Sequence, residues 1–489
     1  MPLDIAGCTA SPAVSVPGDP VDAVSVRMSE VLGALSYALD LTEGQPPGHS
    51  LRCCWIGMHI GRAMGLDEAA LSDLYYALLL KDAGCSSNAA RLWELYGGDE
   101  RAVKHDFKTV DSHSMLQLGR FVLQHAGPGE ALRSRIQRVL AITRSGDEMA
   151  RELVLARCDR GANICRRLGF GEAVAAGVYS LDEHWNGRGR GCGLAGDAIP
   201  INARIALLAQ VVDVFHAVGG EQAARAEVRR RAGSWFDPQV VAAFFDAATD
   251  AAFWSGLTDA APDLPSPDLP SPDLPSPGLP SLDARVAALE PVACVMLVDQ
   301  DRLDIVSAAF ADIVDAKSSF TYSHSRRVMQ YGDAVAAQMG VVPERRRWLR
   351  RASLLHDIGK VAVSNGILDK PGRLDASEFA VIKTHSAHSE VILQRIGIFR
   401  DLAPVAGAHH ERLDGGGYPK GLKAPQIPLE SRIITVADIF DALTAARPYR
   451  GPMPPADALA LMERDRDTAI DSDCLDALHR ALPSMECAV

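Results

Sequence analysis

Histidine and aspartate side chains suited to metal binding fall within one stretch of this 489-residue chain. Four of them form the adjacent pairs His356-Asp357 and His409-His410. Any one of these histidines alone would more often be a core or surface residue, but their combination favours a metal centre. Imidazole and carboxylate groups together suit Fe, Mn, Zn or Ni better than Mg or Ca. The candidate ligands are His324, His356, Asp357, His385, His409, His410 and Asp438.

The order of these residues resembles that of a known family. His324, the HDIGK run at 356–360 and the HHERLDGGGYP run at 409–419 resemble the HD-GYP subgroup of the HD phosphohydrolase superfamily. The ADIFDALTAARPYR run at 437–450 resembles the closing segment of that subgroup. The resemblance implies an all-helical, metal-dependent phosphodiesterase. Members mostly hydrolyse cyclic di-GMP to linear pGpG or GMP, and a few prefer the mixed guanine–adenine cyclic dinucleotide.

The resemblance also implies a role for each matching residue. One metal ion would be held by His324, His356, Asp357 and Asp438. The second would share Asp357 as a bridge and be held by His385, His409 and His410. Lys360 would contact the scissile phosphate, so Asp357 and Lys360 are the predicted catalytic residues. Further substrate contacts would come from Gly417, Tyr418, Arg447 and Arg450.

We expect two divalent ions, with Fe or Mn favoured and Zn or Ni as alternatives. Relatives with three ions carry a glutamate four residues before the first histidine, where this chain has Phe320. A phenyl ring offers no lone pair to a cation, so a third ion would lack a carboxylate. Two neighbouring ions would lower the pKa of a shared water towards ~7 and so supply a nucleophile at neutral pH.

A proline-rich repeat, DLPSPDLPSPDLPSPGLP at 263–280, divides the chain. Proline at this density cannot join a helix and predicts an extended spacer. The expected organisation is a first domain at 1–257, a linker at 258–282 and a catalytic domain at 283–489. The stretches 325–339 and 344–355 carry apolar residues at helical spacing. The predicted fold is therefore all-α, as two tandem HD-type helical domains.

The two halves are predicted to be copies of one domain. A shift of 275 places His49 on His324 and Asp82 on Asp357, and a shift of 228 places Glu183 on Glu411. The first copy therefore contains 47 extra residues. Most of its ligand positions have changed: Lys81, Leu181, Asp182 and Gln210 replace His356, His409, His410 and Asp438, and Cys85 replaces Lys360. We expect the first half to bind no catalytic metal and to act as a sensory, dimerising or scaffold domain.

Composition narrows the class of partner. A net charge of −12 argues against general DNA binding, which needs a basic surface. Neither a signal peptide nor a sufficiently long apolar run is recognised, so a cytoplasmic protein without a membrane segment is expected. The leading function is a cyclic di-GMP phosphodiesterase. The alternatives are hydrolysis of 3',3'-cyclic GMP-AMP or another nucleotide, and a non-catalytic signalling adaptor. A second copy of the chain and signalling proteins are further candidate partners.

Overall fold

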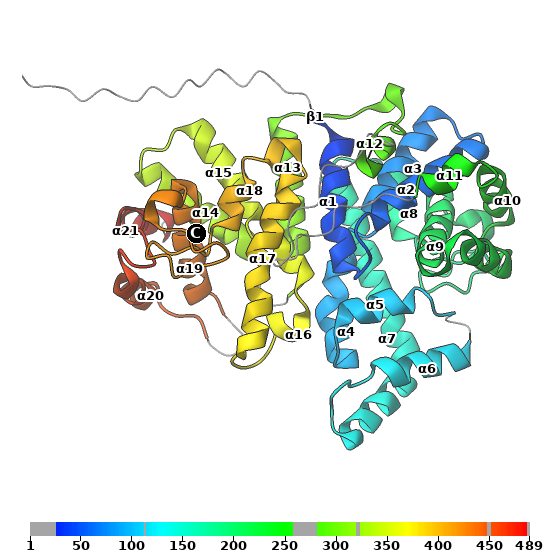
Figure 1. The fold of residues 1–489 in the computed structure, drawn as a ribbon, viewed down its shortest axis with the longest axis horizontal. Coiled ribbons are helices and arrows are strands. Elements are labelled where there is room, and N and C mark those ends of the chain that lie inside the picture. Colours follow the sequence, from blue (N-terminus) through cyan, green and yellow to red (C-terminus); the bar gives the residue numbers. More distant parts are fainter. Residues whose placement is uncertain (1–25, 112–113, 258–280, 319–322, 447–450, 487–489) are drawn as a thin grey trace, which may run out of the picture.

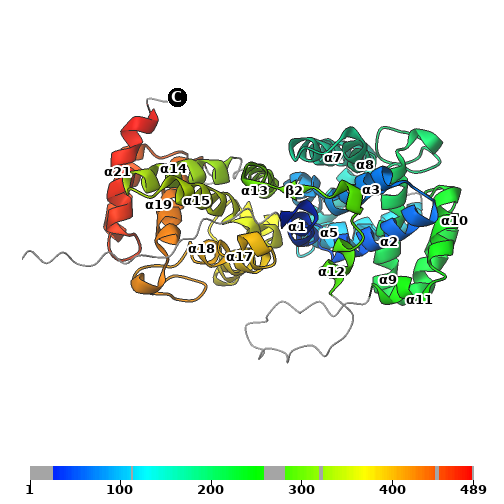
Figure 2. The ribbon, with the colours of Figure 1, turned by 90° about the horizontal axis from the view of Figure 1, so that it is seen from above.

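The structure is a computed structural model that describes residues 26–111, 114–257, 281–318, 323–446 and 451–486. Helices dominate these ranges, and the expected all-α fold is confirmed. Their one sheet is an antiparallel pair of two-residue strands, with Val26 opposite Val298. The two halves lie side by side along the longest axis, and α1 (Met28–Thr42) runs along the boundary (Figures 1 and 2).

The first half contains β1 (Val26–Arg27), α1, α2 (His49–Ala63), α3 (Glu68–Leu80), η1 (Cys85–Asn88), α4 (Ala89–Tyr96), α5 (Glu100–Phe107), α6 (Met115–His125), α7 (Leu132–Arg167), α8 (Glu172–Tyr179), η2 (Gly196–Ala198), α9 (Ile201–Arg231), α10 (Pro238–Ala247) and α11 (Ala251–Ser255). The segment after the linker contains α12 (Leu282–Ala287), η3 (Val292–Cys294), β2 (Leu297–Val298), α13 (Gln300–Asp315), α14 (His324–Gln338), α15 (Pro343–Leu355), η4 (Ile358–Ala362), α16 (Asn365–Leu368), α17 (Ala376–Gln394), η5 (Gly397–Phe399), α18 (Ala403–Gly407), η6 (Ala424–Gln426), α19 (Leu429–Thr444), α20 (Pro455–Met462), η7 (Glu463–Asp465) and α21 (Ser472–Glu486).

Corresponding helices pack in the same pairs in both halves. In the first half α2 packs on α3 and α9, and α7 packs on α8 and η1. In the second half α14 packs on α15 and α19, and α17 packs on α18 and η4. A side chain on Gly84 would collide with the carbonyl of Arg157, and one on Gly359 with the carbonyl of His385. The same close approach of backbone to helix therefore requires glycine in each copy.

The extra residues of the first copy form α4, α5, α6 and the start of α7, and they reach the second half. Glu100, at the start of α5, is fully buried and accepts a hydrogen bond from Lys317 Nζ at 3.0 Å. It also accepts from Ser364 Oγ at 2.8 Å and from Asn365 N at 3.1 Å. A charged pair buried between the halves is therefore fully engaged in hydrogen bonds, as such a pair must be.

The boundary between the halves does not coincide with the end of the linker. Residues 258–280 lie outside the described ranges, and the next helix, α12, packs on α1 and α2 of the first half. The strand β2 then pairs with β1. The segment 282–298, which the sequence assigned mostly to the second domain, thus lies against the first. This segment contains no motif that would assign it to either half, so only its tertiary contacts show where it lies.

Helix α9 has the length and apolar composition of a membrane span: its most apolar 18-residue window has a mean hydropathy of 1.4. That window is 61% buried, and the helix packs against α2, α8 and α10. Its chain departs from helical geometry at Gly219 and Gly220. These features are typical of a core helix.

We predict that Glu100→Ala lowers the free energy of unfolding of the full chain by about 3–5 kcal/mol, because it leaves the ammonium of Lys317 buried without its counter-charge. The matched control is Glu94→Ala, which removes an exposed partner of Arg91 and should change stability by less than about 1 kcal/mol. Chemical denaturation of both variants measures the difference. Equal stabilities would show that the buried pair does not hold the halves together.

Candidate metal centre

Asp357 lies at the centre of the candidate ligands, where α15 ends and η4 begins. Its Oδ1 lies 3.3 Å from His385 Nε2 and 3.7 Å from His409 Nε2. Its Oδ2 lies 3.4 Å from His324 Nε2 and 3.3 Å from His356 Nε2. Each oxygen of one buried carboxylate therefore faces a different pair of imidazoles.

The two remaining candidates lie on opposite sides of Asp357. Asp438, on α19, has its Oδ1 3.3 Å from His324 Nε2. His410 lies with His385 and His409, and the ligand atoms of that group lie within 4.8 Å of one another. His324, His356 and Asp438 form a second group of the same size. The structure thus brings all seven predicted ligands together, although their role as ligands stays a prediction.

The imidazole rings are turned so that their Nε2 atoms face inward. Three Nδ1 atoms contact the backbone carbonyl three residues earlier, and the fourth contacts a carboxylate. Carbonyl oxygens only accept, so Nδ1 donates and Nε2 keeps its lone pair for a cation. The pairs are His356 with Ser353 at 2.7 Å, His385 with Ile382 at 2.6 Å, His409 with Ala406, and His324 with Asp441 at 2.6 Å.

The unsatisfied atoms and the protonation states of two rings fit a metal ion. His324 Nε2, His356 Nε2 and Asp357 Oδ1 are buried and make no hydrogen bond within the described residues. Burial and the neighbouring His385 lower the pKa of His410 to about 3, and burial lowers the pKa of His409 well below its usual value. These two rings are therefore neutral at pH 7, as ligands must be. Despite burial, the neighbouring carboxylates of Asp357, Asp438 and Asp441 raise the pKa of His324 well above its usual value, so its Nε2 must lose a proton when a cation binds. Imidazole and carboxylate donors together suit a borderline divalent ion such as Fe, Mn, Zn or Ni, and its identity stays a prediction.

The predicted substrate residues lie beside this cluster. The ammonium of Lys360, on η4, contacts Asp357 Oδ2 and is one-fifth exposed. The ring of Tyr418 packs against that of His410, with 4.9 Å between centroids. Burial raises the pKa of Tyr418, so its hydroxyl stays protonated and can donate a hydrogen bond.

The structure explains glycine at position 417 by packing within the chain, whereas the sequence suggested a contact with the substrate. A side chain there would collide with the backbone of His410, Glu411 and Arg412, so glycine is required by the chain's own fold. Glu411 supports the same loop, because its carboxylate accepts from Lys420 N at 2.7 Å and Leu422 N at 2.9 Å. The first half keeps this arrangement. There, a side chain on Gly189 would meet the backbone at 182–184, and Glu183 accepts from Gly193 N at 3.0 Å.

Arg447, Arg450 and Phe320 lie outside the described residues. The predicted phosphate contacts of the two arginines, and the two-ion argument drawn from Phe320, therefore stay predictions.

Asp441 is a positioning residue that the sequence reading missed. Its Oδ2 contacts His324 Nδ1, while the guanidinium of Arg327 donates to Oδ1 at 2.5 Å and to Oδ2 at 3.0 Å. The first half contains the same triad: Asp213 lies 2.6 Å from His49 Nδ1 and 2.5 Å from Arg52 Nε. The shift of 228 aligns Asp213 with Asp441. The survival of these three residues in a degenerate copy was the signal that could have identified them.

In the first half an ammonium group lies beside the retained aspartate. Lys81, which replaces His356, is fully buried and contacts the carboxylate of Asp82, the counterpart of Asp357. Attraction between the two holds the pKa of Asp82 far below its usual value despite its burial. A fixed positive charge thus neutralises the carboxylate that bridges the two predicted ions in the other half.

The other ligand positions of the first half carry groups unsuited to a metal. The paired collisions at Gly84 and Gly359 place Arg157 at the position of His385. Two clusters of three donors remain, His49-Cys53-Asp213 and Glu43-Asp82-Cys85. Beside these clusters, the cations Lys81 and Arg157 stand where His356 and His385 would hold the two ions. The expectation that this half binds no catalytic metal therefore stands as a prediction.

Comparison with known proteins defines the class. The family model of the HD domain matches residues 138–240 and 308–474, which together exceed half of the chain. The chain belongs to the HD domain family, and the predicted membership of that superfamily is confirmed. The first matched range lies in the first half, which supports its origin as a copy.

Individual relatives are enzymes that act on cyclic dinucleotides. The chain is 48% identical over 455 residues to 3'3'-cGAMP-specific phosphodiesterase 3 of Vibrio cholerae, covering 93% of this chain and 94% of the relative. It is 38% identical over 178 residues to the cyclic di-GMP phosphodiesterase response regulator RpfG of Xanthomonas campestris, covering 36% of this chain and 47% of the relative. A crystal structure of a cyclic GMP-AMP specific phosphodiesterase of V. cholerae has 43% sequence identity and a TM-score of 0.63, covering 94% of this chain and 98% of that chain.

We predict that Asp441→Asn weakens metal binding about 10–100-fold, because an amide cannot accept from both His324 and Arg327 as the carboxylate does. Metal titration of the purified apo-protein measures this. The control is the same change in the first half, Asp213→Asn, which should leave metal affinity unchanged. Equal losses in the two variants would contradict the assignment of the metal centre to the second half.

Proposed function

We propose that this chain is a metal-dependent phosphodiesterase that hydrolyses 3',3'-cyclic GMP-AMP to a linear dinucleotide. The observation that carries the substrate is the match over nearly the full length of both chains to a relative named for this activity. The relative named for cyclic di-GMP matches only about a third of this chain. The sequence favoured cyclic di-GMP, and the comparisons support the alternative better.

The clustered residues support hydrolysis of a phosphodiester. Two divalent ions, Fe or Mn, would be held on either side of Asp357 and would supply an activated water and Lewis acidity toward the phosphate. Water adds to phosphorus as the bond to the ribose 3′ oxygen breaks, which opens the ring and leaves a 5′ phosphate. Burial keeps the His409 and His410 rings neutral, and contacts of Nδ1 with backbone carbonyls orient the His385 and His409 rings.

Lys360 offers the charge that the reaction needs outside the ligand set. Its ammonium lies against Asp357 and is partly exposed, so it can contact both the cluster and an incoming phosphate. Negative charge grows on the non-bridging oxygens in the transition state, and a fixed cation at that point stabilises it. Lys360 thus acts as an electrostatic stabiliser, and Asp357 as the bridge that sets the spacing of the ions.

An aromatic surface beside the cluster supports binding of a base. Phe379, on α17, is 45% exposed, and its ring centroid lies 6.4 Å from that of Tyr418. Lys383 Nζ lies 4.8 Å from the Phe379 ring and 5.7 Å from the Tyr418 ring. Exposed aromatic rings stack on bases of either kind, so this surface explains affinity for a purine but not a choice between guanine and adenine.

Cyclic di-GMP remains the second candidate substrate, because several relatives of the second half are named for it. A non-catalytic adaptor is disfavoured by the complete ligand set. The cytoplasmic location, a homodimer and contacts with signalling proteins stay predictions.

We predict that the purified full chain turns over 3',3'-cyclic GMP-AMP with a higher kcat/KM than cyclic di-GMP or cyclic di-AMP. Asp357→Ala should lower turnover by more than about a thousandfold, since loss of even one transition-state contact costs ~10²–10³. The control is Asp401→Ala, an exposed carboxylate after η5, which should keep wild-type turnover. Higher kcat/KM for cyclic di-GMP would overturn the substrate, and full activity of Asp357→Ala would overturn the site.

A further inference from the structure

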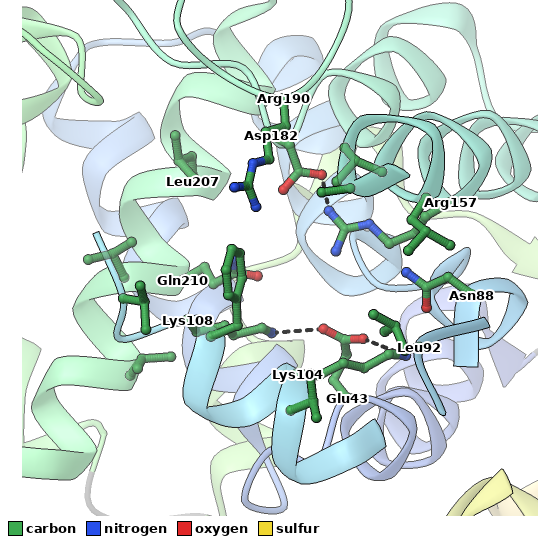
Figure 3. A pocket seen from close by; sticks show the side chains of 18 of the residues that line it. Glu43, Asn88, Leu92, Lys104, Lys108, Arg157, Asp182, Arg190, Leu207 and Gln210 are labelled. Atoms are coloured by element: carbon green, nitrogen blue, oxygen red, sulfur yellow. Dashed lines mark hydrogen bonds and ion pairs between the residues drawn. The ribbon is translucent and has the colours of Figure 1, made fainter. Parts of the chain in front are cut away.

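The first half contains a cavity of about 190 Å³ where its metal site would be (Figure 3). Arg157, Asp182, Arg190 and Gln210 line it. These four stand at the positions of His385, His410, Tyr418 and Asp438 in the second half. Side chains at the positions of the predicted metal ligands thus border a partly open space in this half.

Most of the cavity wall is apolar. Leu92, Phe107, Ile142, Leu153, Val154 and Val211 contribute to it, from the inserted helices α4, α5 and α7 and from the core helix α9. Such a wall favours the apolar part of a ligand, because burying apolar surface removes it from water. An apolar cavity of about 150 Å³ accepts benzene, so this space suits a small molecule and is far too small for a cyclic dinucleotide.

Charged groups lie on two sides of the cavity, and the positive ones outnumber the negative ones (Figure 3). Lys104 Nζ lies 3.1 Å and Lys108 Nζ 3.2 Å from the carboxylate of Glu43. Arg157 pairs with Asp182, and Figure 3 shows both groups facing the space. Including Arg190, whose guanidinium carbon lies 5.1 Å from the Phe107 ring centroid, four cations face two carboxylates.

One buried cation in this cavity wall favours an anionic ligand. The Lys108 side chain is 10% exposed, and its Nζ contacts Glu43 without a hydrogen bond in the part of the chain that the structure describes. Buried polar atoms are nearly always satisfied, so a ligand with a polar head would supply what is missing.

Helix α5 connects this cavity to the catalytic half. Lys104 and Phe107, on its C-terminal part, and Lys108, which directly follows it, line the cavity. At its other end Glu100 holds Lys317, and the guanidinium of Arg101 donates to the carbonyl of Ala362. Ala362 ends η4, the turn that follows Asp357 and contains Lys360. One rigid helix of eight residues therefore touches both the cavity and the catalytic turn.

We propose that this cavity binds a small monocarboxylate with an apolar body, of about the size of octanoate, and that occupancy changes catalytic turnover through α5. The carboxylate would lie against Lys108 and accept a charge-assisted hydrogen bond from its ammonium. The apolar body would lie against the α4, α7 and α9 wall. The effect on turnover rests on the proposed phosphodiesterase function, whereas the binding site does not.

The binding test uses isothermal titration of the full chain with octanoate, acetate and octan-1-ol, without substrate. Saturable binding of octanoate at one site is expected, with acetate and octan-1-ol weaker by about tenfold or more. Lys108→Met should weaken octanoate binding by about tenfold or more, and Leu153→Trp, which fills the space, should abolish it. Arg133→Met, which removes an exposed cation of α7, should bind octanoate as the wild type does.

Three outcomes would overturn the binding site: no saturable binding of octanoate, equal binding of acetate or octan-1-ol, or wild-type binding by both cavity variants. The two variants are used together, and circular dichroism of each confirms that a loss of binding is not a loss of fold.

The coupling test measures hydrolysis of the cyclic dinucleotide with and without saturating octanoate. Turnover of the wild type should change by about fivefold or more, within the usual range of allosteric coupling. In Arg101→Met octanoate should bind with wild-type affinity but change turnover less than about twofold. Binding without any change in wild-type turnover would overturn the regulation. An enzyme inactive on every cyclic dinucleotide that still binds octanoate would instead contradict the proposed function alone.

Discussion

Seven predicted ligand side chains gathered around one small space are the constraint on which the second half depends. Imidazole nitrogens and carboxylate oxygens at 3.2–3.7 Å from one another have no hydrogen atoms to share once each Nδ1 carries its proton. A metal ion between them satisfies these lone pairs and so removes the cost of leaving them unpaired. Backbone carbonyls of α15, α17 and α18 contact the Nδ1 atoms of three of these rings, so the helices determine how the rings are oriented. The fold therefore fixes the orientation of these imidazole rings before a metal ion binds.

The first half has the same helix packing but balances its buried charges in a different way. Its packing pairs, its glycine contacts and the His49-Asp213-Arg52 triad are retained, so its fold does not require the metal. The ammonium of Lys81 balances the charge of the buried Asp82 carboxylate. This positive charge is part of the chain, whereas a metal ion could exchange with solvent. Since the Lys81 ammonium cannot activate water, the change preserves stability and removes the chemistry. The neighbouring ligand positions are then free to carry other groups, and they line a cavity instead.

The sequence alone predicted the helical fold, the duplication and the set of residues that come together. Two constant offsets identified the copies, and the adjacent pairs His356-Asp357 and His409-His410 marked the cluster because such pairs are uncommon on a helical surface. It could not predict that Gly417 is needed by its own loop, since a glycine near a ligand and a glycine near a backbone give the same pattern. The packing of residues 282–298 on the first half, and that of α5 on η4, depend on contacts between segments far apart in sequence, which no local pattern encodes. The choice between guanine and adenine is equally invisible, because the predicted metal ligands and Lys360 would act on the phosphate, and stacking on Phe379 and Tyr418 would accept either base.

Anomalous diffraction from crystals of the full chain, collected across the iron and manganese absorption edges, tests whether the second half holds a two-ion metal centre. We expect two peaks per chain, one on each side of Asp357. The first should lie beside His324, His356 and Asp438, and the second beside His385, His409 and His410. No peak should lie beside Lys81. A peak in the first half, a third peak beside Asp357, or peaks that lie away from these seven side chains would contradict this expectation.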